Sequence, residues 1–126
     1  MKKLRHEIRD PIHNFVRLDN TERKIVDSEP FQRLRHIHQL AMSYLVYPGA
    51  THKRFEHSLG VMELAGKVFD RITDVNNRHP DFTERFNDKL EKRDYWKRTV
   101  KAAALCHDMG HLPFSHATEK ILAERA

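Results

Sequence analysis

The sequence predicts an all-α fold, a mainly helical bundle preceded by a short N-terminal β-hairpin. Two observations lead to this prediction. Apolar residues recur at helical spacing from about residue 53 to 75 and again from about 94 to 107. Residues 6–18 instead alternate loosely around Asp10-Pro11, a turn signal, and Phe15-Val16 favours an extended strand. The length, 126 residues, suits one domain with a modest core.

The composition indicates a folded protein. Hydrophobic residues make up 39% and charged residues 33%, a mixture typical of a soluble chain rather than a disordered one. No apolar run approaches the roughly 20 residues that span a bilayer, and the N-terminus lacks the apolar stretch of a secretory signal. Cys106 is the only cysteine, which excludes an internal disulfide. We therefore expect a cytoplasmic protein without a membrane partner.

The net charge indicates a class of ligand. Lys and Arg number 23 against 18 Asp and Glu, a formal net charge of +5. A basic balance suits a phosphate-bearing ligand or nucleic acid, and it does not choose between them. Because acidic residues are interspersed with the basic ones, a solvated basic surface explains the charge equally simply.

Two short helices are predicted after the hairpin. Thr21 is a suitable cap for a helix that runs through Asp27. Ser28 or Glu29, placed before Pro30, then opens a second helix. Its apolar residues recur every third position and predict a helical stripe: Phe31, Leu34, Ile37 and Leu40. An extended segment from Tyr44 to Tyr47 should follow, ending in a turn at Pro48-Gly49.

The long helix from about Lys53 to Val75 is predicted to bury one stripe, which consists of His57, Val61, Leu64, Val68 and Ile72. A charged segment, residues 81–95, should form a surface helix or a crossover, with Phe82, Phe86 and Leu90 at helical spacing.

The next predicted helix begins near Asp94. One of its faces carries Trp96, Val100, Ala103 and His107. Gly110 and Pro113 should end it, and Ser115 should cap a last helix that begins at His116.

Three side chains form the candidate functional site. His57 and His107 lie on the apolar stripes of separate helices, so packing these helices can bring the two imidazoles together. Asp108 follows directly. Burying such groups without partners is costly, and a bound metal would offset that cost. Two imidazoles and a carboxylate suit a divalent ion such as Mn, Fe, Zn or Ni, which would polarise a phosphoryl oxygen.

Several motifs carry a resemblance to a known family. The most specific are Arg54-Phe55-Glu56-His57-Ser58-Leu59-Gly60 and the run from His107 to His116, HDMGHLPFSH. Shorter matches are Asp10-Pro11-Ile12-His13, Phe31-Gln32-Arg33-Leu34-Arg35, Gln39-Leu40 and Tyr47-Pro48-Gly49-Ala50. With these motifs the chain resembles the HD-domain phosphohydrolases, and among them the deoxynucleoside triphosphate triphosphohydrolases.

The resemblance implies roles for individual residues. It implies a divalent ion, Mn, Fe, Zn, Ni or Mg, held by His57, His107 and Asp108. His111 matches a catalytic acid near the leaving oxygen, and Arg54 and His116 match residues that contact the phosphates. Gln39 and Leu40 match residues that lie against the sugar and help favour a deoxyribose.

The implied activity is hydrolysis of a deoxynucleoside triphosphate to a deoxynucleoside and triphosphate, with Asp108 and His111 at the reacting centre. The alternatives are an HD hydrolase of another phosphoester (a nucleoside monophosphate, a cyclic nucleotide or a nucleic-acid end) and a non-catalytic nucleic-acid-binding or regulatory module. Family members often form oligomers, so self-association is expected by resemblance.

One feature departs from the family pattern. Known members complete the metal site with a second aspartate, roughly a hundred residues beyond the His-Asp pair. After Asp108 the acids in this chain are Glu119 and Glu124, and neither matches that position. We therefore expect residues 1–126 to form a single HD-type domain that is incomplete on its C-terminal side. A truncated form and a degenerate member remain the alternatives to a fragment.

Overall fold

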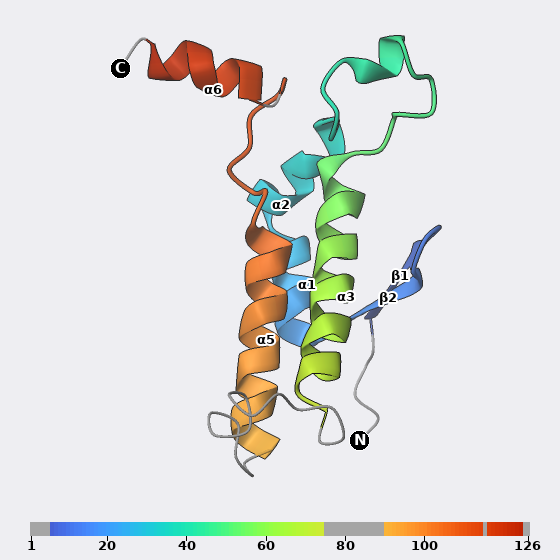
Figure 1. Ribbon diagram of the computed structural model, residues 1–126, viewed down its shortest axis with the longest axis vertical. Helices are drawn as coiled ribbons and strands as arrows, with labels where there is room; N and C mark the ends of the chain where they lie inside the picture. The colour runs from blue at the N-terminus through green and yellow to red at the C-terminus, as the bar shows by residue number, and fades with distance from the viewer. Residues whose placement is uncertain (1–5, 75–89, 115, 125–126) are drawn as a thin grey trace.

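The computed structural model describes residues 6–74, 90–114 and 116–124. Its elements follow in the order β1 His6–Asp10, β2 Asn14–Leu18, α1 Asn20–Val26, α2 Glu29–Gln32, the 3₁₀ turns η1 Arg33–His36 and η2 Ser43–Leu45, α3 Arg54–Ile72, α5 Leu90–Cys106 and α6 His116–Ala123. Helices α3 and α5 lie side by side, α1 packs behind them, and the hairpin leaves from the flank of α3 (Figure 1). The predicted helical fold with an N-terminal hairpin is confirmed.

The hairpin turns where the sequence predicted it. Strands β1 and β2 pair antiparallel, with Ile8 opposite Val16. The Asp10 carboxylate accepts hydrogen bonds from the backbone N–H groups of Ile12 and His13, at 2.9 and 2.7 Å, which fixes the turn. Val16 and Leu18 are buried and join the hairpin to the core.

Helix α1 begins earlier than predicted, and the prediction of Thr21 as its cap was wrong. Asp19 is the cap, because its carboxylate accepts from the N–H groups of Thr21 and Glu22 at 2.8 Å. The Glu22 carboxylate in turn accepts from the Asp19 N–H, also at 2.8 Å. This reciprocal capping box satisfies more free donors than a threonine cap at position 21 would.

The predicted helix over residues 31–40 is much shorter. Helix α2 passes into η1, and the chain is extended at Ile37. A spacing of three is the period of a 3₁₀ helix, so the pattern fitted the tighter turn better than an α-helix. Phe31, Leu34 and Ile37 are buried as predicted, whereas Leu40 is exposed.

The prediction of an extended segment from Tyr44 to Tyr47 was also wrong, because Ser43–Leu45 forms the 3₁₀ turn η2. Aromatic and branched residues favour strands when they pack against a partner strand, and the described part of the chain offers none here. The turn at Pro48-Gly49 is confirmed, and the Ala50 N–H donates to the Tyr47 carbonyl at 2.9 Å.

Helix α3 begins one residue after the predicted Lys53, ends at Ile72 rather than near Val75, and buries a different face from the predicted one. Its buried residues include Phe55, Leu59, Met62 and Phe69, again at spacings of four, three and seven. Phe55 packs edge-on against Phe31, with ring centroids 5.3 Å apart. These residues join the buried ones of the hairpin and of α1, α2 and η1 in a single core.

The stripe predicted to be buried lies on the other side of α3. Leu64, Val68 and Ile72 are exposed, and with Val61 and Val100 they line a shallow groove of about 390 Å³. Helix α3 carries apolar residues on two faces, and periodicity alone does not tell which of them the described residues cover.

Helix α5 starts at Leu90 rather than Asp94 and ends at Cys106, before Gly110. The predicted apolar face of α5 is also exposed to solvent, at Trp96, Val100 and Ala103. Leu105 is instead fully buried. Helix α6 begins at His116 as predicted.

Other predictions fall on residues outside the description. These are the segment 81–89 with Phe82 and Phe86, and the cap at Ser115. Among the described helices, none combines the length and the apolar character needed to cross a bilayer.

A buried ion pair fastens α5 to α1. The Lys101 ammonium lies 2.6 Å from a Glu22 carboxylate oxygen, and both side chains are largely buried. The Lys101 stem passes Gly66 of α3 so closely that an added Cβ there would lie 3.3 Å from its Cδ. Because Gly66 has no side chain, the Lys101 stem can pass close to α3 and reach Glu22 on α1.

Replacing Glu22 with Ala should lower the free energy of unfolding by about 3 kcal/mol, because it leaves a buried ammonium without its partner. Urea denaturation measures the change. The control is Lys67→Ala, which removes an exposed pair with Glu63 and should cost about 0.5 kcal/mol or less. Equal losses in the two variants would contradict the assigned role of Glu22.

Candidate metal centre

The antiparallel packing of α3 and α5 places the start of one helix beside the end of the other (Figure 1). The start of α3 is fixed by two hydrogen bonds. The Arg54 N–H donates to the Ile37 carbonyl at 2.9 Å, and the Glu56 carboxylate accepts from the Lys53 N–H at 2.6 Å. His57 follows in the first turn of the helix, while His107 and Asp108 follow the last residue of α5, Cys106.

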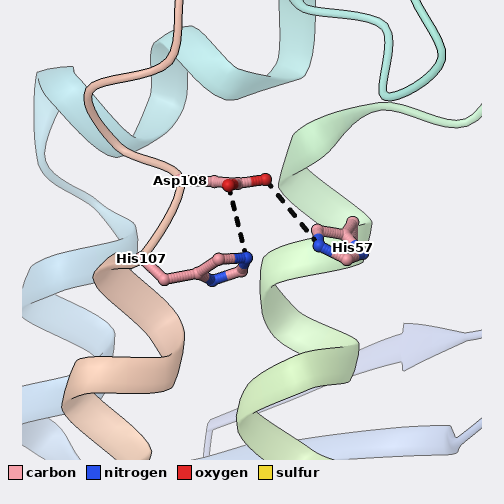
Figure 2. Close-up of side chains that lie close together, drawn as sticks. All are labelled: His57, His107 and Asp108. Atoms are coloured by element: carbon pink, nitrogen blue, oxygen red, sulfur yellow. Dashed lines mark ion pairs between the residues drawn. The ribbon is translucent and has the colours of Figure 1, made fainter. Parts of the chain in front are cut away.

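The three predicted ligands come together at this end of the helix pair. His107 Nε2 lies 3.3 Å from Asp108 Oδ1, and His57 Nε2 lies 3.7 Å from Asp108 Oδ2 (Figure 2). The two imidazole rings have centroids 5.2 Å apart. One ligand atom from each residue falls within 4.8 Å of the other two, a spacing at which all three can hold one ion.

The surroundings set the chemical form of the histidines. His107 Nδ1 lies 2.7 Å from the Ala104 carbonyl oxygen. Because a carbonyl only accepts, Nδ1 carries a hydrogen, and Nε2 is the nitrogen of His107 that faces Asp108 and is available to a metal. Burial lowers the pKa of His57, as do His107 and Arg54, while Asp108 opposes the shift. A neutral imidazole is the form that binds metal.

The Asp108 carboxylate is buried and paired with Arg54. Arg54 Nη1 donates to Asp108 Oδ2 at 2.7 Å, and both residues are nearly inaccessible to solvent. A close guanidinium offsets part of the cost of burying a carboxylate. Sequence reasoning assigned Arg54 to substrate phosphate, and the structure adds this contact with a candidate ligand.

The three candidate ligands favour one class of divalent ion. Two imidazoles and one carboxylate suit Mn, Fe, Zn or Ni better than Mg, which prefers oxygen ligands. The residues therefore fit a divalent transition metal.

The structure places the other predicted site residues as follows. His111 joins the cluster, with Nε2 3.8 Å from Asp108 Oδ1. The Gln39 N–H donates to the His52 carbonyl at 3.0 Å, which sets Gln39 near the start of α3, and its buried Oε1 has no partner among the described residues. Leu40 is half-exposed. His116 is the first residue of α6.

Arg33 also contributes to the site. It lies in one of the shorter family motifs, and the sequence predicted no role for it. Arg33 donates from Nη2 to the carbonyl oxygens of Met109 and His111, at 2.9 and 2.7 Å. No local signal in the sequence marks these contacts, because they join residues 76 and 78 positions apart.

Comparison with known proteins identifies the family of this chain. The HD domain matches residues 54–126, more than half of the chain, and this segment contains all three candidate ligands. The chain belongs to the HD-domain phosphohydrolase family. A hypothetical protein from Aquifex aeolicus has a similar solved structure, with a TM-score of 0.73 and 39% identity, over 95% of this chain and 27% of that one.

Curated relatives of this HD-domain chain include the deoxynucleoside triphosphate triphosphohydrolase SAMHD1. The Homo sapiens protein is 44% identical over 109 residues, which are 86% of this chain and 16% of the relative. The Xenopus laevis protein is 46% identical over 107 residues, 85% and 15% of the two chains. An uncharacterized protein from Methanocaldococcus jannaschii is 45% identical over 89% of this chain and 20% of its own. The chain thus spans about a quarter or less of the relatives that it matches.

The lowered pKa of His57 predicts a pH-dependent stability in metal-free buffer. The unfolded chain protonates His57 at a higher pH than the folded chain does, so folding stability should fall as the pH drops from about 7.5 to 5.5. In His57→Gln this decrease should be smaller. Urea denaturation across that range measures both slopes, and parallel curves for the two proteins would contradict the prediction.

Proposed function

We propose that this chain contributes the metal centre of a phosphohydrolase that converts deoxynucleoside triphosphates to deoxynucleosides and inorganic triphosphate. The observation that carries the proposal is the convergence of His57, His107 and Asp108 at one point. A divalent ion bound there would polarise a phosphoryl oxygen and lower the pKa of a water molecule. Relatives named as triphosphohydrolases of deoxynucleoside triphosphates support the choice of substrate.

The reaction needs a proton donor at the nucleoside. A water oxygen bonds to the α-phosphorus and the water releases a proton to solvent, while the bond from that phosphorus to the 5′ oxygen breaks. The triphosphate thereby gains a hydroxyl group and the deoxynucleoside leaves. His111, 3.8 Å from Asp108 Oδ1, lies beside the centre and is the proposed acid that protonates the 5′ oxygen.

The substrate also brings negative charge that the protein must balance. Arg54 and His116 are the proposed phosphate contacts. A guanidinium has five N–H donors in a fork. Arg54 holds Asp108 through one of these nitrogens, so a contact with phosphate would use another donor of the same fork. Gln39 and Leu40 are proposed to lie against the deoxyribose. We also propose that a second aspartate completes the metal site, as in the family, and that the protein forms an oligomer.

The first test is metal binding by the purified chain. After incubation with Mn²⁺ or Zn²⁺ and desalting, we expect about one ion per chain by mass spectrometry. His107→Ala should lose the ion, whereas His36→Ala, a change at an exposed histidine of η1, should keep it. A wild-type chain that retains no ion would show that these three ligands do not suffice for binding.

The second test is the product of hydrolysis. With dGTP or dATP and metal, chromatography should detect deoxynucleoside and triphosphate. His111→Ala should lower kcat by about 10²-fold or more and keep the metal content, because it removes only the acid. Turnover within a few-fold of wild type would exclude His111 as the acid. Cleavage of nucleoside monophosphates or of oligonucleotides instead would favour the other HD activities.

A further inference from the structure

The loop that follows α5 carries two of the residues that the proposed chemistry uses. Asp108 and His111 lie on either side of Gly110, a residue with wide backbone freedom. Two turns shape the loop, since the Met109 N–H donates to the Cys106 carbonyl at 3.1 Å and the His111 N–H donates to the Asp108 carbonyl at 3.0 Å. These bonds are local and do not tie the loop to the rest of the protein.

Arg33 provides such a tie from a distant part of the chain. Its Nη2 atom donates to the Met109 carbonyl at 2.9 Å and to the His111 carbonyl at 2.7 Å, across 76 and 78 residues of sequence. The two acceptors flank Gly110, so a single guanidinium nitrogen holds the backbone on both sides of this glycine. Hydrogen bonds from a charged donor are stronger than those between neutral groups.

The segment that carries Arg33 is itself anchored in the core. Arg33 begins η1, and its neighbours Phe31 and Leu34 are fully buried. Ile37, which directly follows η1, accepts a hydrogen bond from the N–H of Arg54. Arg54 is the first residue of α3 and pairs with Asp108. The segment that carries Arg33 is therefore fixed to both the core and the helix that carries His57.

We propose that Arg33 is a positioning residue, which holds the Met109–His111 backbone so that the His111 imidazole faces Asp108 and the reacting phosphate. This inference rests on the proposed function for the role of His111. Arg33 acts through the loop, and a displacement of about 1 Å in a catalytic group can cost 10²-fold in rate.

Arg33→Ala should lower kcat by about 10- to 100-fold and change KM by less than about 3-fold, because uniform substrate binding is left in place. Arg33→Lys should recover part of the loss, since an ammonium can also donate to two carbonyls. The control is Arg17→Ala, which removes an exposed arginine paired with Glu7 on the hairpin and should leave kcat unchanged.

A double variant tests whether Arg33 acts through His111. If it does, Arg33→Ala should cause little further loss of kcat in the His111→Ala background. Independent, multiplying losses would overturn the inference, and so would a wild-type kcat in Arg33→Ala.

Amide hydrogen exchange gives a readout that needs no activity. Peptides covering Leu105–Leu112 should exchange faster in Arg33→Ala and near the wild-type rate in Arg33→Lys, while peptides of α3 remain protected. Unchanged exchange in the loop would overturn the inference even if the enzyme proves inactive on nucleotides. If the loop exchanges faster in Arg33→Ala but turnover is unchanged in His111→Ala, the role of Arg33 in holding the loop stands and His111 is not the acid.

Discussion

The buried pair of Arg54 and Asp108 is the interaction on which the arrangement of the site depends. It joins the first residue of α3 to the residue that follows α5 by two positions, at 2.7 Å, in a place that water hardly reaches. Removing two charges from water is costly, and only close contact with good geometry offsets that cost. The two long helices are therefore held in one register, in which His57 and His107 face the same carboxylate.

The pair also supplies the Asp108 carboxylate with a positive charge from within the protein. Burying a carboxylate among the candidate ligands is costly unless an opposite charge lies close to it. Arg54 supplies a positive charge on one oxygen, Oδ2, while the other oxygen, Oδ1, faces His107 and His111. The carboxylate is thus held by Arg54 with its other oxygen directed at the two histidines, which lowers the reorganisation that metal binding requires.

Sequence patterns were most informative where the signal is local. The Asp10-Pro11 turn, the start of α3 and the proximity of His57 to His107 and Asp108 were all predicted, because each depends on turn chemistry or on a motif. The buried face of α3 was not, since its two apolar stripes have the same period and only tertiary packing distinguishes them. The 3₁₀ form of η1 was missed because a spacing of three was assigned to an α-helix. The contacts of Arg33 cross more than seventy residues, and no local pattern encodes them.

The passage of Lys101 beside Gly66 has a consequence for how this protein can change over evolution. The Lys101 stem fills the space where a side chain at position 66 would lie, and its ammonium must still reach Glu22 on α1. A larger residue at 66 would push the stem aside and lengthen the ion pair. Positions 66, 101 and 22 thus form a coupled set drawn from three helices. Among homologues that keep this packing, a substitution at one of them should be accompanied by a compensating change at another.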